Sequence, residues 1–301
     1  MSGRAAKIID AIRSDTRRGA SELVRDALAA FTATIDDAPA SAPLQPRLEN
    51  TARALLDAQP AMAPLLALAC SVLRGTTNTT PDRTSAAAKQ AVLEFASRLD
   101  RIAREVPERA DALIPAGGRV LTLSSSATVR RALTLAAARR TFDIVCLEGR
   151  PALEGREMAA ALAGHGIRVV VAVDAALGSV MRDCDVVLVG ADSIGDLGVV
   201  NKIGTRAAAL LARRGGIPIY SIADSTKLLP AGWPQELDGD RATTEVWPDA
   251  PAGVTIWNRY FETTPLAWFD GVVTEDGLRS EADIEMQRSR LHVPAPLRDA
   301  A

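Results

Sequence analysis

Cysteine and histidine are scarce in this sequence, which limits the metal sites that it can form. It contains three cysteines, Cys70, Cys146 and Cys184, and two histidines. The cysteines lack the spacing of a zinc motif, and the sequence has no Cys/His cluster. Two of them fall in or beside predicted strands, where a free thiol behaves as a small apolar group. The sequence therefore predicts buried free thiols, no metal site and a reducing compartment.

Glycine motifs that bind nucleotides are also missing. No G-x-G-x-x-G follows the first predicted strand, and no G-x-x-x-x-G-K-[ST] occurs anywhere. Because these glycines let the backbone approach a nucleotide's phosphates, neither a nicotinamide dinucleotide nor a P-loop nucleotide is supported. We expect no cofactor, and a nucleotide-dependent oxidoreductase is disfavoured.

Neither sign of charge dominates, and long apolar runs are absent. The formal net charge is −2 and the pI is near 5.8, which gives no general attraction to nucleic acid or to a membrane surface. No apolar run reaches membrane-spanning length, and the N-terminal stretch MSGRAAKIIDAIRSD lacks the apolar region of a signal peptide. We expect a cytoplasmic protein without a nucleic-acid or membrane partner.

The pattern of apolar residues changes near residue 115. With 48% hydrophobic residues over 301 positions, the chain can bury a sizeable core and is long enough for two domains. Residues 1–115 show helical spacing, with a long helix predicted over roughly 85–112. Pro115 to Gly118 interrupts this pattern, and we expect a second, α/β domain over residues 116–301.

Short β-type runs alternate with helical segments in the second domain. The helices are expected to begin near Ala127, Glu154, Ala175 and Gly204. The runs are VLTL, DIVCLE, IRVVVAV, DVVLVG, IPIYSI and GVVT. Such alternation predicts parallel strands joined by right-handed crossovers, hence a doubly wound sheet. The residues from Ser193 to Lys202 are interpreted as turns, and residues 227–265 as irregular structure.

Polar side chains that follow these strands are the first candidate site residues. Ligands of doubly wound sheets bind beyond the carboxyl ends of the strands, where these side chains are expected to meet. Several cations around one carboxylate and some hydroxyls would suit a small phosphorylated polyol. Taken singly, each has a structural alternative: a helix cap, an ion pair or a solvated residue. The residues are Ser124, Arg150, Asp192, Lys202 and Lys227.

A basic turn in the helical domain is a further candidate. Residues Thr16 to Ser21 place Arg17 and Arg18 beside Gly19, at the predicted start of a helix. Guanidinium groups together with unpaired backbone N–H groups suit a phosphate. The alternative is a solvated turn between two helices.

The motifs along the chain resemble those of one known superfamily. It joins the alpha, beta and delta regulatory subunits of translation initiation factor 2B with methylthioribose-1-phosphate isomerase and ribose-1,5-bisphosphate isomerase. The pair GADSI and VNKIGT is specific, and the other motifs run in order from residue 18 to 277. They are Arg18-Gly19-Ala20, VLTLSSS, Glu148-Gly149-Arg150-Pro151 with Glu154-Gly155, GADSI at 190–194, VNKIGT at 200–205, STK at 225–227, NRYFETTP at 258–265 and VTEDG at 273–277.

The resemblance implies a fold and a set of roles. The fold is a helical N-terminal domain followed by a Rossmann-like α/β domain, commonly dimerising through the latter, so we expect a homodimer. Asp192 would be one of two catalytic residues. The residues implied at the substrate and its phosphate are Arg18, Gly19, Ala20, Arg150, Asn201, Lys202 and Lys227.

Two positions depart from the isomerases. Ser124 stands where they carry a second catalytic residue, a cysteine, and a hydroxyl does not exchange protons near neutrality as a thiol does. Gln59 aligns with a phosphate-contacting arginine of ribose-1,5-bisphosphate isomerases. The leading hypothesis is a protein that binds a phosphorylated sugar and, as an enzyme, an aldose–ketose isomerase of a sugar 1-phosphate. The alternative is a non-catalytic, ligand-sensing subunit like the initiation factor 2B alpha subunit.

Overall fold

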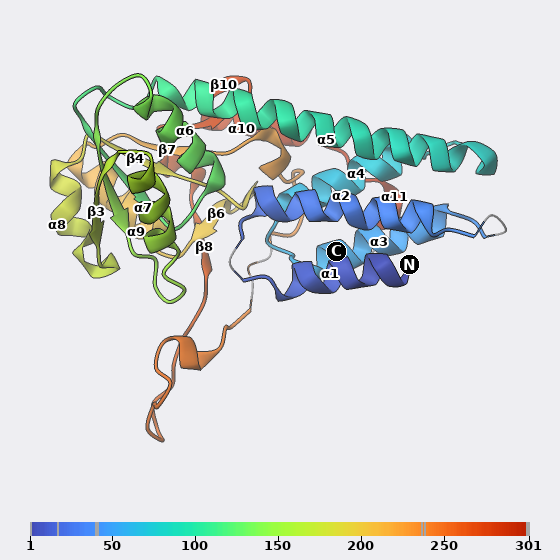
Figure 1. Cartoon of the computed structure of the whole chain (residues 1–301), viewed down its shortest axis with the longest axis horizontal. Helices are drawn as coiled ribbons and strands as arrows, with labels where there is room; N and C mark the ends of the chain where they lie inside the picture. Colours follow the sequence, from blue (N-terminus) through green and yellow to red (C-terminus); the bar gives the residue numbers. More distant parts are fainter. Residues whose placement is uncertain (1, 17, 40–41, 236, 238, 299–301) are drawn as a thin grey trace.

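The computed structural model describes residues 2–16, 18–39, 42–235, 237 and 239–298. Figure 1 shows a bundle of helices that extends from one side of an α/β body. The bundle consists of α1 (Gly3–Ser14), α2 (Ala20–Asp36), α3 (Gln45–Ala58), α4 (Ala63–Gly75) and the first part of α5 (Pro81–Asp111). The predicted order, helices first and an α/β unit second, is confirmed.

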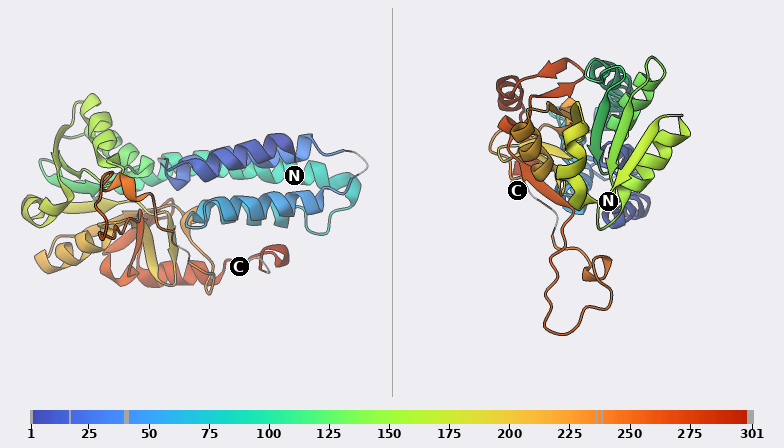
Figure 2. Two further views of the ribbon diagram at one scale, coloured as in Figure 1. Left: turned by 90° about the horizontal axis from the view of Figure 1, so that it is seen from below. Right: turned by 90° about the vertical axis from the view of Figure 1, so that its left-hand side faces the viewer.

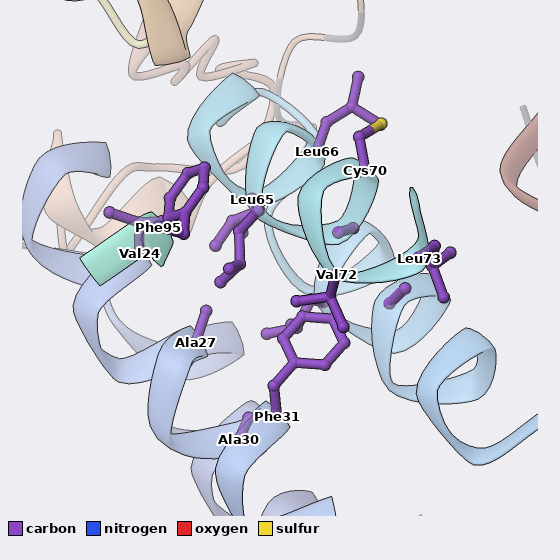
Figure 3. Close-up of a cluster of buried hydrophobic side chains, with 14 of the residues drawn as sticks. Val24, Ala27, Ala30, Phe31, Leu65, Leu66, Cys70, Val72, Leu73 and Phe95 are labelled. Atoms are coloured by element: carbon purple, nitrogen blue, oxygen red, sulfur yellow. The ribbon is translucent and has the colours of Figure 1, made fainter. Parts of the chain in front are cut away.

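The bundle is held together by the apolar faces of its helices. Val24 and Phe31 of α2, Leu65 and Val72 of α4, and Phe95 of α5 are buried in one cluster, part of which appears in Figure 3. Burying a large aliphatic or aromatic side chain contributes about 1.5–3 kcal/mol, so this face is sufficient reason for the helices to associate.

Helix α5 ties the bundle to the α/β body. Phe95 and Leu99, near its middle, are part of the bundle core, whereas Val106 and Ala110, near its end, belong to a separate core under the sheet. The view from below in Figure 2 shows the helix continuing from one part into the other. Because one rigid helix contributes to both cores, the two parts are held in a fixed arrangement.

The central sheet has seven strands in the order β10-β9-β7-β4-β1-β2-β3. All neighbours are parallel except β10 and β9. The strands are β1 (Arg119–Leu123), β2 (Asp143–Leu147), β3 (Arg168–Ala172), β4 (Val186–Val189), β7 (Ile219–Ile222), β9 (Gly271–Thr274) and β10 (Gly277–Arg279). The six predicted parallel strands are confirmed. The connecting helices include α6 (Ala127–Ala137), α7 (Glu154–Gly164) and α9 (Thr205–Gly215).

Strand β1 lies at the point where the strand order reverses. The chain passes from β1 outward through β2 to β3, then returns to β4 on the other side of β1. At such a point the connections leave in opposite directions and open a crevice beyond the carboxyl ends of the strands. Ser124 follows β1, and Gly190 to Asp192 follow β4, so both candidate catalytic residues lie at this crevice.

The prediction of turns from Ser193 to Lys202 is wrong. Strands β5 (Ser193–Gly195) and β6 (Gly198–Lys202) form a hairpin there, and β6 also pairs with β8 (Phe261–Thr264) in a small antiparallel sheet. Local sequence did not show this because strand β8 lies about sixty residues away, within the stretch expected to be irregular. Gly198, with φ of 100°, allows the tight hairpin turn.

The remaining helices are short. The helix expected near Ala175 is a 3-10 turn, Asp174–Ala176, followed by α8 (Leu177–Val180). After the sheet come α10 (Glu281–Ser289) and α11 (Ala295–Arg298). Among the described residues, no helix combines the length and the apolar character needed to cross a membrane. The three cysteines are free and buried, as predicted.

These thiols should be unreactive in the native protein. Burial raises the pKa of Cys70 and Cys184 to about 11 and that of Cys146 to about 12. Since the thiolate is the nucleophile, we expect negligible reaction with Ellman's reagent at pH 8, rising about tenfold with each pH unit. Three equivalents should react after denaturation, and a rapid equivalent at pH 8 in the folded protein would contradict the burial.

An apolar strip is exposed along the edge strand β3. Val170 and Val171 near the end of this strand, and Val173 just after it, are 49%, 48% and 56% exposed. Proteins usually cover apolar edge strands.

The homodimer stays a prediction, and we expect it to bury this strip. Val171→Lys should then give monomers in light scattering, whereas Leu278→Lys on the opposite edge should not. If light scattering gave the same mass for both variants, the exposed strip on β3 would not be the dimer interface.

Candidate functional site

A cleft lies beyond the carboxyl ends of β1 and β4, against the start of α2. It encloses about 650 Å³ including its open mouth. The residues that line it include eight of the nine predicted site residues, the exception being Arg150. They are Arg18, Gly19, Ala20, Ser124, Asp192, Asn201, Lys202 and Lys227. The structure therefore brings together residues from positions 18 to 227.

Two glycines allow the walls of the cleft to approach one another. A Cβ on Gly190 would lie 2.7 Å from the Ser126 hydroxyl, so only glycine lets the end of β4 lie against the turn after β1. A Cβ on Gly155 would lie 1.8 Å from the carbonyl oxygen of Leu147, so only glycine lets α7 start this close to β2. The second contact fixes the position of Glu154, the first residue of α7.

Asp192 is held by backbone contacts at the floor of the cleft. Its N–H donates to the carbonyl of Val200 at 2.8 Å, and its own carbonyl accepts from Ala63 at 3.3 Å. The residue is 8% exposed. The hairpin β5–β6 and the start of α4 thus fix the backbone of the candidate proton-transfer residue from two sides.

Ser124 ends β1 in an unusual conformation. Its φ is 62°, a left-handed value that non-glycine residues rarely adopt, and its side chain lines the cleft. Two residues on, Ser126 accepts from the N–H of Val129 at 3.4 Å and caps α6. Of the three serines, one is therefore a helix cap, and Ser124 is the one whose backbone is turned at the strand end.

Lys202 is buried in a salt bridge. Its Nζ lies 2.7 Å from Oε1 of Glu154, and the two side chains are 3% and 11% exposed. The ammonium also lies 4.6 Å from the centroid of the Tyr260 ring, within range for a cation–π interaction. Oε2 of Glu154 is buried without a hydrogen-bond partner among the described residues. An acceptor of this kind, beside a cleft, can accept from a ligand hydroxyl.

Lys227 and Asn201 complete the floor. The Lys227 ammonium donates to the carbonyl of Ala191, next to Asp192. Asn201 donates to the Thr205 hydroxyl at 2.9 Å, which fixes its amide at the start of α9. Each side chain is less than 8% exposed. An ammonium has three N–H donors, so both lysines keep donors beyond the contacts named here.

The basic turn of the helical domain forms the opposite wall. Gly19 is the N-cap of α2, and no side chain caps this helix end. The Arg18 guanidinium lies 2.6 Å from Asp15 and 2.8 Å from Asp26, and these hydrogen bonds raise the pKa of Arg18. Arg17, the other arginine of the turn, lies outside the described residues. The backbone N–H of Arg18 donates to Asp15 at 2.9 Å, and the start of α2, which lines the cleft, is the kind of helix end that binds anions.

Arg150, which was expected at a phosphate, and Gln59 both lie outside the cleft lining. The Arg150 guanidinium is exposed and donates to the carbonyls of Glu245 at 3.4 Å and Val246 at 3.3 Å. Gln59, which was predicted to stand where ribose-1,5-bisphosphate isomerases carry an arginine, donates to the carbonyls of Ile12 and Asp15 at the end of α1. Gln59 therefore supports the turn that carries Arg18 and is not itself part of the cleft lining.

Two cleft residues were given no role by the sequence. Glu154 belongs to a quoted motif, and Tyr260 to another, but neither had a predicted function. Tyr260 donates to Oε1 of Glu245 at 2.6 Å, and its ring is within cation–π range of both Lys202 and Arg241, whose guanidinium is 4.8 Å from the centroid. Burial and this hydrogen bond raise the pKa of Tyr260 well above its usual value. The signal for Glu154 was a carboxylate at the start of a helix behind a strand.

Known proteins share both the sequence and the fold. A putative translation initiation factor eIF-2B subunit 2-like protein of Pyrococcus abyssi is 28% identical over 91% of this chain and 96% of its own length. The ribose 1,5-bisphosphate isomerase of Haloferax volcanii is 31% identical over 86% of this chain and 84% of its own. The crystal structure of translation initiation factor eIF-2B from Pyrococcus horikoshii OT3 superposes with a TM-score of 0.82 at 28% identity, covering 93% and 98% of the two chains.

These relatives match nearly the whole chain, and a model of one protein family matches most of it as well. The model of the initiation factor 2 subunit family matches residues 16–280, which includes the basic turn, the strands of the cleft and the pair of lysines. On this match, the chain belongs to the initiation factor 2 subunit family.

Proposed function

We propose that the cleft binds a phosphorylated sugar. The observation that supports this most strongly is the gathering of Lys202, Lys227 and the N-terminus of α2 around Asp192 in one cleft. Two ammonium groups and unpaired backbone N–H groups suit a phosphate, and the carboxylates and hydroxyls suit sugar hydroxyls. The similarity to a ribose 1,5-bisphosphate isomerase supports the same ligand class.

The reaction that this arrangement suits is the isomerisation of a cyclic aldose 1-phosphate to a ketose 1-phosphate. The bond between C1 and the ring oxygen breaks, and the ring oxygen takes the proton of the C2 hydroxyl. The hydrogen on C2 moves to C1, which leaves a carbonyl at C2, so no atom is gained or lost. Asp192 would carry a proton in this exchange, and Ser124 would donate a hydrogen bond to a sugar oxygen.

The second candidate function is binding without turnover, and Ser124 favours it. A serine hydroxyl cannot take the role of a thiol in proton transfer without strong activation, and neither histidine, at positions 165 and 292, lines the cleft. In this case the protein would sense a sugar phosphate as a regulatory subunit does.

The two candidates are separated by turnover. The purified protein is incubated with ribose-1,5-bisphosphate and with methylthioribose-1-phosphate, while ketose formation and the melting temperature are followed. A raised melting temperature with ketose formation supports the isomerase, and one without it supports the sensor. If neither compound changes the melting temperature, the proposal that the cleft binds a phosphorylated sugar fails.

The buried salt bridge should be needed for binding more than for folding. Removing Lys202 alone would leave an unpaired buried carboxylate and lower the stability of the fold by about 3–5 kcal/mol. A loss of binding in that variant could then not be distinguished from a loss of folding. We therefore expect the double variant Glu154→Gln/Lys202→Gln, which removes both charges, to fold but to lose stabilisation by a sugar phosphate in a thermal-shift titration. The surface pair Arg101→Gln/Glu105→Gln is the matched control. Unchanged ligand stabilisation in the first variant would exclude Lys202 from the phosphate site.

Ser124→Cys tests the role of the missing thiol. If binding persists without turnover in the natural protein, we expect this variant to form ketose, because a thiol titrates near neutrality whereas a hydroxyl does not. Asp192→Asn in the same background should abolish the gained activity while ligand stabilisation in the thermal-shift assay persists. Activity that survives Asp192→Asn would assign the proton transfer to another group.

A further inference from the structure

A second cavity lies apart from the cleft, between the helical bundle and the α/β body. It is bounded by α4, α5, the 3-10 turn Ser225–Lys227 and the segment after α10, and it encloses about 410 Å³ including its mouth. None of the residues that line it also lines the cleft. It therefore requires an explanation other than the proposed sugar-phosphate site.

The inner wall of this cavity is apolar. Leu66 and Cys70 of α4 face Leu228, Pro230 and Leu291 across it. Figure 3 shows Leu66 and Cys70 on the side of α4 away from Phe31, where they belong to the buried cluster of the bundle and also line this cavity. Leu291 is 37% exposed at the rim. An apolar ligand group would gain free energy by displacing water from this wall.

Two arginines lie beside the apolar wall, and the carboxylate of Glu275 reaches one of them, Arg98, only through the Ser225 hydroxyl. Arg74 of α4, Arg98 of α5 and His292 line the cavity, and none of the described lining residues is acidic. Arg98 donates to the Ser225 hydroxyl at 2.8 Å, which uses one of the five N–H donors of its guanidinium. Arg74 makes no ion pair or hydrogen bond through its side chain with the described part of the chain. In a protein of net charge −2, such a cluster is open to an anion.

A larger, polar cavity adjoins the first and shares Arg74 and His292 with it. It encloses about 990 Å³ including its mouth, and its lining again contains no described acidic residue. Thr76, Thr77 and Asn78 of the turn between α4 and α5 line it, and the Oε1 atom of Gln45, another lining residue, is buried without a described partner. Arg74 thus lies where an apolar compartment meets a polar, solvent-connected one, and Arg98 lines the apolar compartment only.

We propose that this junction binds a small organic carboxylate with a short unbranched apolar body. The apolar wall would take the body, and the guanidinium groups of Arg74 and Arg98 would hold the carboxylate, which their planar donors match. A free inorganic anion would leave the apolar wall in contact with water. A cationic or neutral ligand would leave Arg74 without a counter-ion.

The test uses the full-length protein and hexanoate as the probe. Binding is followed by saturation-transfer NMR titration, with hexan-1-ol and inorganic phosphate as matched compounds that each lack one half of the ligand. We expect hexanoate to bind more tightly than either. Arg74→Met and Arg98→Met should each weaken hexanoate binding about tenfold, as loss of a charge-assisted hydrogen bond predicts. Arg101→Met on α5, which does not line the cavity, should leave binding unchanged.

A third variant addresses the apolar half. Cys70→Phe fills the inner wall and should also weaken hexanoate binding, provided that its circular dichroism and unfolding transition show a folded protein. The arginine variants decide the matter if this one does not fold. The proposal is overturned if hexanoate does not bind, if hexan-1-ol binds equally well, or if both arginine variants bind as the natural protein does. If inorganic phosphate displaced hexanoate and both arginine variants still bound it, hexanoate would be bound in the proposed sugar-phosphate cleft instead.

Discussion

The burial of a lysine is the constraint on which the candidate site depends. An ammonium that is 3% exposed must be matched by a carboxylate, because an unpaired charge at that depth costs several kcal/mol. Here the match joins the last residue of β6 to the first residue of α7, two elements that are separated by about fifty residues. The ring of Tyr260, next to β8, closes over the same ammonium. Three segments of the α/β body therefore meet at the Lys202 ammonium, and the cleft lies beside this contact.

This arrangement also determines what the cleft offers a ligand. Its cations are already engaged by the protein: Arg18 by two aspartates, Lys202 by Glu154, and Lys227 by a backbone carbonyl. These contacts fix the positions of the charges and reduce the ordering required when an anion arrives. They also leave the lysines with donors that are not used by the contacts described above. A cleft of this kind is suited to binding in one orientation, which recognition and proton transfer both require.

Much of the architecture was predictable because it depends on local patterns. The six parallel strands appeared as short buried runs rich in Val, Ile and Leu, and the helical bundle as apolar residues at helical spacing. The strands β5, β6 and β8 were missed because their pairing depends on partners remote in sequence. The positions of Ser124 and Asp192 at the crevice followed from the rule for doubly wound sheets. Arg150 was expected there by the same rule, yet the segment around Glu245, whose position the sequence did not show, holds its side chain outside.

The sequence by itself determined the succession of helices and strands, the family and the residue types available for chemistry, since these follow from periodicity and from ordered motifs. It also led to the prediction that Ser124 stands where the isomerases of the family carry a cysteine, which rests on the order of the motifs alone. Only the tertiary structure decided that Glu154 neutralises Lys202, that Tyr260 covers the pair and that Gln59 supports the basic turn. Those outcomes depend on which side chains meet when separate elements pack, and burial then requires each polar group to find its partner there.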